Sequence, residues 1–359
     1  MNLTIGITCN SFKNSGGMER YTLDLVNGFV KKGIRVVIFT QKADFNLPES
    51  KLVEIVIVPC KFILGKLRPQ YFSWRLKSLK KKHPVDVMIG CCRTLYTDLY
   101  ICGGTHPGFL RETKKKVGFF DKLTCAFEEK VYRGAKKIVA HSDMIRKEIE
   151  EFYPSCKDKT VLLYPAVNLE KFKVETLQRA PTENLRQKFG IACERLLYVF
   201  VSSSHERKGF NLLREFFEKT DLPVSLLVCG RPLPKGSYKN IYYLGYLNDL
   251  ERIYPQCDFA ILASTYEPFG LVGIESVAMN TPLIASNKLG CTEVISEDCM
   301  LLFNPHSINS LEEVVKYSVD NVSALKSAAS GDLDSKFKFS LGLENHILNL
   351  LEVCKFIIK

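Results

Sequence analysis

The chain has 359 residues, 46% of them hydrophobic and 25% charged, and carries a formal net charge of +11 at pH 7. This length suits two domains of ordinary size, and the composition is that of a globular protein. None of the 13 cysteines belongs to a C-x-x-C pair and most lie in apolar runs, which argues against a zinc site or a disulfide framework. The cysteines therefore indicate a reduced, cytoplasmic protein.

The charge leaves three classes of partner open: nucleic acid, an anionic membrane surface and an anionic small molecule. No apolar run reaches the roughly 18 residues that a membrane span requires. The first residues lack the basic and apolar regions of a signal peptide. We therefore expect any association with a membrane to be peripheral.

The chain opens with a strand over 3–9, the glycine pair Gly16-Gly17, a helix over 18–32 and a strand over 35–40. Strand, glycine turn and helix are typical of a Rossmann-like unit. A nicotinamide cofactor is disfavoured, because Gly-Gly is not G-x-G-x-x-G and no acid ends the second strand. The glycines fit either a tight turn or the close approach of a phosphate or sugar.

Two segments of the first half, 61–82 and 111–122, combine lysines with aromatic residues. They fit either ordinary solvated surface or an interfacial patch, with lysines on anionic headgroups and aromatic rings at the acyl boundary. We favour the interfacial patch, and we expect it to bind the inner face of the cytoplasmic membrane. No nucleic-acid partner is expected, because no reader motif occurs.

Two histidines follow predicted strands in the first half. His106 lies on a glycine-flanked loop after a strand over 98–102, and a structural and a functional role both remain open. His141 ends a strand over 136–142, and we expect it to pack against the sheet. Ser142 is a good N-cap for the helix that follows.

The second half repeats the pattern with a strand over 196–202, a basic turn over 203–209 and a helix over 210–219. Further strands are predicted over 224–229, 241–246, 257–263 and 283–286, and further helices over 307–330 and 336–359. The fold class is thus α/β, with two doubly wound, Rossmann-like parallel-sheet domains over 1–165 and 166–340. The amphipathic helix 341–359 is expected to pack back on the first domain.

The most informative segment runs from the strand over 257–263 through a loop into a helix over 271–279. The loop contains Glu267 and the helix contains Glu275. Open α/β sheets bind ligands at the carboxyl ends of their strands, and a helix N-terminus suits a phosphate. Two carboxylates beside such a site suggest recognition of hydroxyl groups, as on a ribose or a sugar.

Arg207 and Lys208 follow another strand of the same predicted sheet. They are either surface charges or a clamp for a diphosphate, which would take the place of a metal ion. The D-x-D sequence Asp332-Leu333-Asp334 is expected to be a turn and a helix cap. No metal and no cofactor is therefore expected.

These motifs together resemble those of the retaining GT-B glycosyltransferases of family 4. The resemblance rests on Glu267-x7-Glu275, Arg207-Lys208-Gly209 and Gly16-Gly17-Met18-Glu19-Arg20, and it covers nearly the whole chain. Arg93-Thr94 and Gly103-Gly104-Thr105-His106 look closest to the lipopolysaccharide-core glucosyltransferase I branch. The resemblance implies two Rossmann-like domains that face each other across a cleft, with the acceptor on the first and the nucleotide-sugar on the second.

The resemblance also implies roles for individual residues. Glu275 would hold the nucleotide ribose and Glu267 the donor sugar, while Arg207 and Lys208 would neutralise the departing diphosphate. His106 would lie on the acceptor side of the sugar. The remaining donor contacts would come from Gly16, Gly17, Ser202, Arg231, Phe269, Gly270, Leu271 and Val272. The resemblance further implies that retention proceeds by front-face attack. A covalent double displacement would need a nucleophile, and the sequence does not identify one.

The implied donor is a UDP-sugar such as UDP-glucose, and the implied acceptor is a lipopolysaccharide-core or other lipid-linked glycan (a glycolipid). The chain departs from the family pattern at Asn280 and Ser202, where a glycine is usual, and at 165–167. Ser202 could tighten or shift the diphosphate pocket. Two alternatives remain: a non-catalytic membrane-binding scaffold of the same fold, and a UDP-sugar 2-epimerase. The sequence does not identify the sugar or the base.

Overall fold

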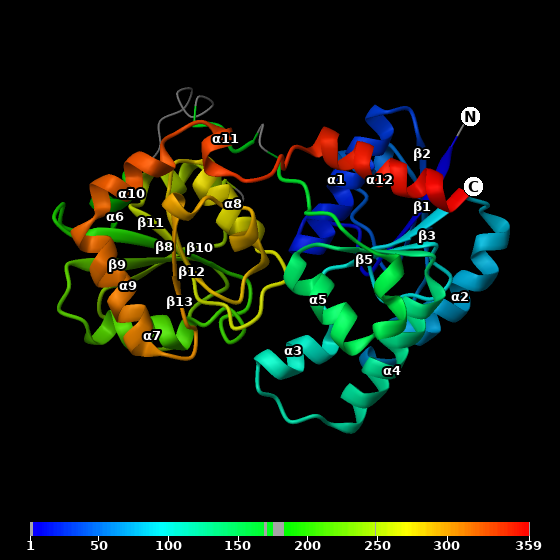
Figure 1. Cartoon of the computed structure of the whole chain (residues 1–359), viewed down its shortest axis with the longest axis horizontal. Helices are drawn as coiled ribbons and strands as arrows, with labels where there is room; N and C mark the ends of the chain where they lie inside the picture. The colour runs from blue at the N-terminus through cyan, green and yellow to red at the C-terminus, as the bar shows by residue number, and fades with distance from the viewer. Residues whose placement is uncertain (1–2, 169–170, 175–182, 248, 359) are drawn as a thin grey trace. The chain divides into compact units, whose positions relative to one another are not determined.

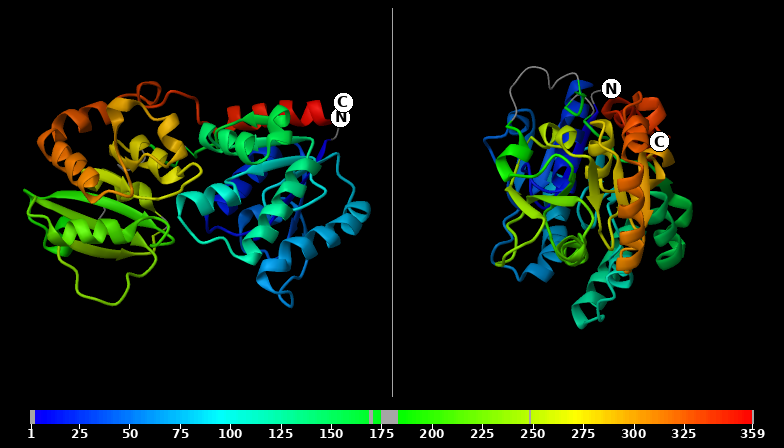
Figure 2. Two further views of the ribbon diagram at one scale, coloured as in Figure 1. Left: turned by 60° about the horizontal axis from the view of Figure 1, so that its bottom comes forward. Right: turned by 90° about the vertical axis from the view of Figure 1, so that its left-hand side faces the viewer.

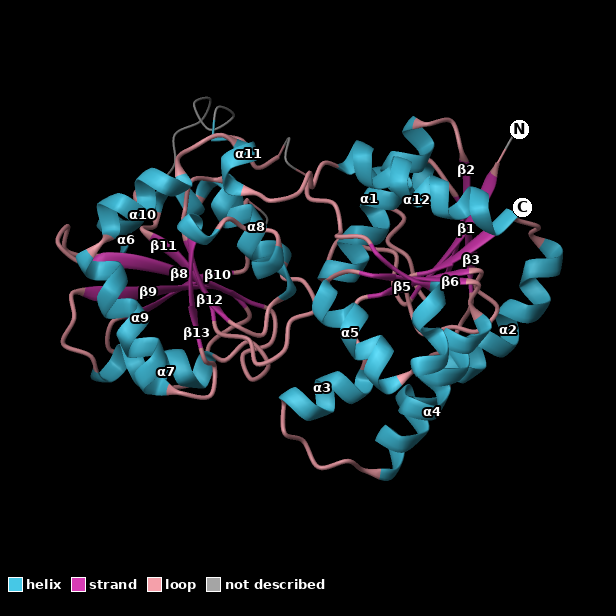
Figure 3. Ribbon diagram, in the orientation of Figure 1, coloured by secondary structure: helices cyan, strands magenta, loops and turns pink. Residues whose placement is uncertain are grey.

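The computed structural model describes residues 3–168, 171–174, 183–247 and 249–358 (Figure 1). It divides into two compact units, each built around one parallel sheet. The first, which we call the N-terminal domain, comprises Met1–Ala166 and Leu341–Lys359, and the second, the C-terminal domain, comprises Val167–Ser340. Figure 3 shows helices on both faces of each sheet.

The N-terminal domain contains seven parallel strands in the order β3-β2-β1-β4-β5-β6-β7. Helices cover both faces of this sheet, so most strand residues are apolar and buried, as is usual for a parallel sheet. The strands are β1 (Thr4–Cys9), β2 (Arg35–Thr40), β3 (Glu54–Ile57), β4 (Val87–Gly90), β5 (Leu99–Cys102), β6 (Lys137–Ala140) and β7 (Thr160–Leu162). The main helices are α1 (Gly17–Lys31), α2 (Arg68–Lys82), α3 (His106–Glu112), α4 (Phe119–Gly134), α5 (Asp143–Phe152) and α12 (Leu343–Ile358).

The last helix, α12, completes the core of the N-terminal domain (Figure 2, red). Its apolar face packs against α1 and β4. His346 fastens it, because its Nδ1 donates to the main-chain oxygen of Tyr164 at 2.9 Å and its Nε2 accepts from the Tyr21 hydroxyl at 2.8 Å. Burial lowers the pKa of His346 to about 4, so this histidine is neutral at physiological pH.

His141 is buried, as the sequence predicted, and its ring packs edge-on against Tyr21, with the ring centroids 4.7 Å apart. Ser142 caps α5 as predicted, because its side chain accepts from the main-chain N–H of Ile145. Burial lowers the pKa of His141 to about 3.

The C-terminal domain contains six parallel strands in the order β10-β9-β8-β11-β12-β13. The strands are β8 (Leu196–Ser202), β9 (Val224–Gly230), β10 (Ile241–Gly245), β11 (Phe259–Leu262), β12 (Leu283–Ser286) and β13 (Met300–Phe303). The helices are α6 (Leu185–Phe189), α7 (Phe210–Lys219), α8 (Leu271–Ala278), α9 (Ile308–Asp320), α10 (Val322–Ala329) and α11 (Leu333–Lys336). The fold class is therefore the one predicted, with two Rossmann-like α/β domains.

Several predicted elements need correction. The sequence missed β13, a four-residue strand whose Leu302 is 45% exposed, because so short a run has no clear period. The helix predicted over 307–330 is interrupted at Asn321, and the one predicted over 336–359 begins only at Leu343. Asp332 caps α11 by accepting from the main-chain N–H of Ser335, as predicted.

Asn280 has a positive φ of 61°, a conformation that glycine adopts without cost. Asparagine is among the few other residues that tolerate it. Here its side-chain oxygen accepts a hydrogen bond from the buried Lys336 of α11. An asparagine can therefore stand where the family resemblance implies a glycine, and Lys336 holds its side chain.

Among the described residues, none of the helices has the length and apolar content that crossing a bilayer requires.

Candidate active site

Two loops of the C-terminal domain leave the same edge of its sheet. One connects β8 to α7 and contains Arg207 and Lys208, and the other connects β11 to α8 and contains Glu267. β8 and β11 are neighbouring parallel strands, so their carboxyl ends lie side by side. This edge is where open α/β sheets bind ligands.

The structure brings the three predicted charged residues into one cluster. Arg207 Nη1 donates to Glu267 Oε2 at 2.8 Å, and Lys208 Nζ lies 3.4 Å from the same oxygen. Arg207 also donates to the main-chain oxygen of Tyr266, and the Ser264 hydroxyl lies 3.4 Å from Glu267 Oε2. The cluster thus joins both loops at the carboxyl edge.

The electrostatics of the cluster favour an ionised Glu267. Burial by itself would raise the pKa of Glu267, but the Lys208 ammonium and the Arg207 guanidinium outweigh burial and lower it. One carboxylate is thus shared by two cations, which leaves a net charge of about +1 to meet an anion. Lys208 is only 8% exposed, so little water competes for its charge.

Gly209 lets the two loops pack main chain against main chain. Its φ is +78°, and a Cβ added there would overlap the main-chain oxygen of Ala263. The neighbouring Thr265 N–H donates to the main-chain oxygen of Arg207 at 3.3 Å. The sequence Arg-Lys-Gly therefore has a physical reason, because the glycine brings the two cations next to the β11 loop.

The residue before α8, Gly270, is its N-cap. Gly270 has a φ of +94° and no side chain that could accept a hydrogen bond from the first turn of the helix. A helix that starts in this way directs the N–H groups of its first turn, here including Leu271 and Val272, toward whatever lies beyond its N-terminus. The loop before it is held in place, because the Glu267 N–H donates to Lys288 O at 3.1 Å and the Phe269 carbonyl accepts from Cys291 N at 2.7 Å. The segment from Phe269 to Val272 can therefore receive a phosphate.

Glu275 lies in the second turn of α8 and is 2% exposed. The Tyr254 hydroxyl donates to its Oε2 at 3.4 Å. The sequence alone gave no reason to single out Tyr254, because it lies on a different segment 21 residues earlier. Glu275 is thus a buried hydrogen-bond acceptor one turn after the start of α8.

Ser202 and Arg231 lie where β8 and β9 end side by side. The Ser202 carbonyl accepts from the Arg231 N–H at 2.8 Å. The Ser202 hydroxyl is buried and has no hydrogen-bond partner among the described residues. The Arg231 side chain is exposed.

The sequence also did not indicate a role for His205. Its Nε2 donates to the carbonyls of Arg231 and Pro232, both at 3.0 Å, and its ring packs on Phe210. This histidine therefore ties the β8 loop to the β9 loop.

The other predicted site residues belong to the N-terminal domain. Gly16 is the N-cap of α1, with an ordinary φ of −80° and no side-chain cap, and a Cβ at Gly17 would meet nothing within 4 Å. The fold itself therefore does not require a glycine at position 17. A ligand could approach the main chain at Gly17, whereas a Cβ at Gly16 would lie 2.8 Å from Glu19 Oε2.

His106 was expected on a loop, and this expectation is wrong. His106 is the first residue of α3, whose N-cap Thr105 accepts from the N–H of Gly108. Pro107 follows it, and proline in the first turn of a helix is a common sequence signal of a helix start. The His106 Nε2 lies 3.0 Å from Asp121 Oδ1.

Family models match both domains. Residues 15–171 match the model described as Glycosyltransferase Family 4, and residues 181–329 match the model described as Glycosyl transferases group 1. A protein of Burkholderia thailandensis named "Probable transglycosylase" is 37% identical over 354 residues, which cover 98% of this chain and 96% of that protein. An uncharacterized glycosyltransferase of Methanocaldococcus jannaschii is 22% identical over 340 residues, 82% of this chain and 83% of that protein.

Solved structures share the whole fold. The crystal structure of WaaG, a glycosyltransferase involved in lipopolysaccharide biosynthesis, has a TM-score of 0.79 at 19% identity and covers 98% of this chain and 99% of its own. Anabaena HepE in complex with UDP and glucose has a TM-score of 0.74 at 16% identity, covering 98% and 99%. At these identities the likeness shows the GT-B fold. With both domain models and a full-length relative in agreement, the chain belongs to glycosyltransferase family 4 and is a glycosyltransferase.

Proposed function

We propose that this enzyme is a retaining hexosyltransferase that moves a sugar from a UDP-sugar, such as UDP-glucose, to a lipopolysaccharide-core or other lipid-linked glycan. The observation that carries the proposal is the cluster of Glu267 with Arg207 and Lys208 beside the start of α8. HepE, whose structure has been solved with UDP-glucose, and WaaG, described as acting in lipopolysaccharide biosynthesis, support the donor and acceptor classes by analogy.

In the proposed reaction, an acceptor hydroxyl forms a bond to the anomeric carbon as the bond from that carbon to the diphosphate breaks. Negative charge develops on the departing diphosphate, where Arg207, Lys208 and the N–H groups at the start of α8 would stabilise it. The departing phosphate oxygen takes the acceptor's proton, so attack occurs on the face from which UDP leaves. The two cations would do the work that a metal ion does elsewhere.

Glu267 would bind hydroxyls of the donor sugar, since its carboxylate is ionised and already oriented by Arg207. Glu275, buried behind the start of α8, would accept hydrogen bonds from the ribose. Gly16 and Gly17 would admit phosphate oxygens to the start of α1. His106 would contact the donor sugar, while Ser202 and Arg231 would line the donor loops.

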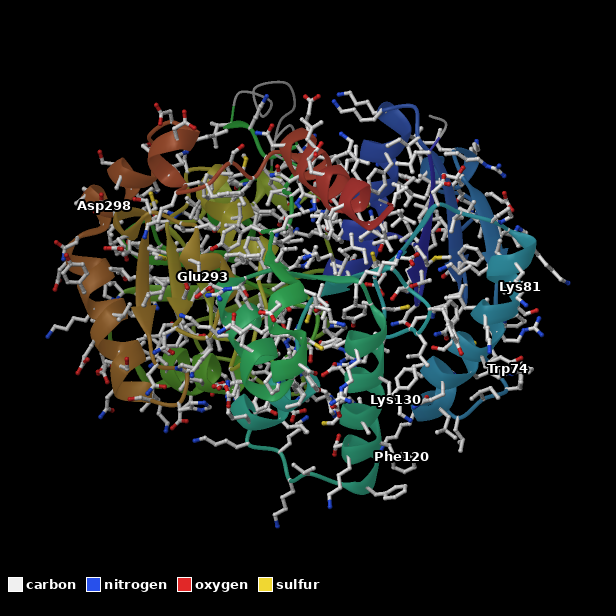
Figure 4. The ribbon with its side chains drawn as sticks, turned by 45° about the vertical axis from the view of Figure 1, so that its right-hand side comes forward. Trp74, Lys81, Phe120, Lys130, Glu293 and Asp298 are labelled. Atoms are coloured by element: carbon white, nitrogen blue, oxygen red, sulfur yellow. The ribbon has the colours of Figure 1, made fainter. Side chains whose placement is uncertain are left out.

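We also propose that the N-terminal domain lies on an anionic membrane surface. The segments 61–82 and 111–122 meet, because Lys66 Nζ lies 4.3 Å from the ring centroid of Phe120. Figure 4 shows Trp74 along α2 and Phe120 at the start of α4. The exposed aromatic residues of what we call the basic-aromatic surface are Phe62 (68%), Trp74 (65%), Phe119 (71%) and Phe120 (41%). Rings of this kind next to lysines suit a lipid headgroup region.

The function is tested by measuring UDP release and sugar transfer by the purified protein with UDP-, GDP- and ADP-sugars and a panel of glycolipid acceptors. Lys208→Ala and Glu275→Ala are each expected to lower kcat/KM by about a hundredfold or more, as loss of one preorganised charge or hydrogen bond does. Lys219→Ala, which removes an exposed lysine of α7, is the matched control and should leave kcat/KM unchanged. NMR of the product should show the anomeric configuration of the donor.

Full turnover in both site variants would refute the site assignment, and an inverted product would refute retention. A sugar isomerised without an acceptor would instead indicate an epimerase. The base is identified separately, because the preferred nucleotide-sugar should raise the unfolding temperature most.

A further inference from the structure

Two carboxylates of one helix, α4, hold His106. The His106 ring Nε2 lies 3.0 Å from Asp121 Oδ1, and the His106 main-chain N–H donates to Glu128 Oε2 at 2.8 Å. Asp121 and Glu128 are seven residues apart, about two helical turns, so they lie on the same face of α4. One helix therefore fixes both the backbone and the ring of His106.

Glu128 is a structural anchor. It is fully buried, and it also accepts from Arg93 Nε at 2.5 Å and from the Tyr153 hydroxyl at 2.8 Å. A carboxylate with this many donors keeps its position, so the main chain at His106 is fixed to the body of the domain. The ring itself stacks on Phe109, with the ring centroids 6.2 Å apart, and meets the other carboxylate at Nε2.

Asp121 is shared between two donors. Its Oδ2 accepts the N–H of Gly118 at 2.9 Å and so caps the start of α4, while its Oδ1 meets the His106 ring. The Gly118 N–H and the His106 ring together lower the pKa of Asp121, so it is ionised and both of its oxygens accept. A neutral His106 then carries its proton on Nε2 and keeps Nδ1 as an acceptor.

The turn of α4 that Asp121 caps also belongs to the basic-aromatic surface. Phe119 and Phe120 directly precede Asp121, and Lys66 lies on the ring of Phe120. A shift of this turn would move the carboxylate that orients His106. The exposed rings and the His106 ring are thus connected through one side chain.

We propose that Asp121 is a positioning residue for His106, and that it links the orientation of the His106 ring to the basic-aromatic surface. This inference rests on the proposed role of His106 in sugar transfer. It adds a residue outside the predicted site and gives the surface a role in turnover as well as in location.

Asp121→Asn tests the positioning. An amide replaces one acceptor oxygen by an NH2 group, so it cannot accept from the Gly118 N–H with one atom and from the His106 Nε2–H with the other. We expect kcat to fall about tenfold because the ring is misplaced or held in the other tautomer, with the donor KM unchanged. Asp121→Glu keeps two acceptor oxygens, and glutamate is common at this capping position, so it should restore most of kcat. Asp143→Asn, which removes an acid from the first turn of α5, is the matched control and should retain kcat.

A double-mutant cycle with His106→Gln separates positioning from a general loss of stability. Asp121→Asn should lower kcat no further in the His106→Gln chain. An equal loss in that background would overturn the proposal. Anionic vesicles should raise kcat of the unmodified chain more than that of Asp121→Asn, and an equal effect on both would overturn the link to the surface.

A spectroscopic measurement that needs no activity completes the test. The ¹⁵N signals of the His106 ring, identified by their absence in His106→Gln, should report a proton on Nε2 in the unmodified chain and a changed tautomer ratio in Asp121→Asn. Identical signals in both would overturn the positioning. If the signals change as expected but His106→Gln transfers sugar at full rate, the contact stands and the proposed role of His106 falls.

Discussion

The charge balance of the candidate active site depends on three side chains. Glu267 meets both Arg207 and Lys208, so the cluster holds one more positive charge than negative before a ligand binds. The buried Lys208 has given up most of its hydration, and an arriving diphosphate would replace it. The ion pairs with Glu267 hold the two cations in place without a ligand, and their excess positive charge suits the cluster to an anionic ligand.

A buried histidine outside this site, His141, gives a prediction on pH. Burial lowers the pKa of His141 to about 3 in the folded state, against about 6.5 in an unfolded chain. The unfolded state therefore binds more protons, and His141 reduces stability progressively as the pH falls from about 6.5 toward 3. At pH 5 the titration of His141 lowers the free energy of unfolding by about 2 kcal/mol.

His141→Phe removes this titration and keeps a ring against Tyr21. We expect the variant to gain about 2 kcal/mol of stability relative to the unmodified chain when the pH changes from 8 to 5. Urea unfolding at both pH values measures this difference, and the pH 8 value accounts for any change in packing. The same difference in stability at both pH values would contradict the prediction.

The helix starts near the candidate site differ in how they are capped. α3 and α5 have side-chain caps, Thr105 and Ser142. α1, α7 and α8, which contribute the predicted donor contacts or follow them, begin at glycines without a side-chain cap. A helix start without a side-chain cap leaves N–H donors for a ligand. The missing cap alone does not mark a binding site, because α2 and α10 also begin without one.

The β8 loop gives a prediction at this scale. Gly209→Ala combines a positive φ with an overlap on the Ala263 main chain, whereas Gly190→Ala has a positive φ of 62° and open space around it. We expect Gly190→Ala to cost about 1 kcal/mol of unfolding free energy from backbone strain alone. Gly209→Ala should cost more and should also separate the two loops of the site.

Thermal unfolding and donor KM distinguish the two glycine variants. Gly209→Ala should lower the unfolding temperature further than Gly190→Ala and raise the donor KM, while Gly190→Ala should leave KM unchanged. Equal effects on both quantities would mean that the two loops do not depend on close main-chain packing.

For the whole molecule, the net charge of +11 is consistent with an anionic partner, and the basic-aromatic surface of the N-terminal domain is the place where we propose that this partner binds. Phe119→Ser with Phe120→Ser should reduce co-sedimentation with anionic vesicles about tenfold or more, because two rings no longer enter the interface. Phe45→Ser, which removes an exposed ring of the same domain outside this surface, is the matched control. Neutral vesicles should bind none of the three proteins strongly. Equal binding by all three chains would refute the proposed surface.

Much of the fold could be predicted because its signals are local. β2, β8, β12 and α7 have the predicted bounds, since each is a continuous apolar run or a clear helical period between polar residues. The sequence did not predict β13, because a strand of four residues shows no clear period. It also did not predict that α3 starts at His106, because that start depends on the Thr105 cap.

The sequence by itself determined the alternation of strands and helices, the family, and the residue types of the candidate site, because these follow from local periodicity and short motifs. Only the tertiary structure decided that β8 lies beside β11, so that Arg207 and Lys208 meet Glu267. It also brought Tyr254 to Glu275 and Asp121 to His106. The physical reason is that strand order and these side-chain contacts join residues far apart in the chain, and no local pattern encodes them.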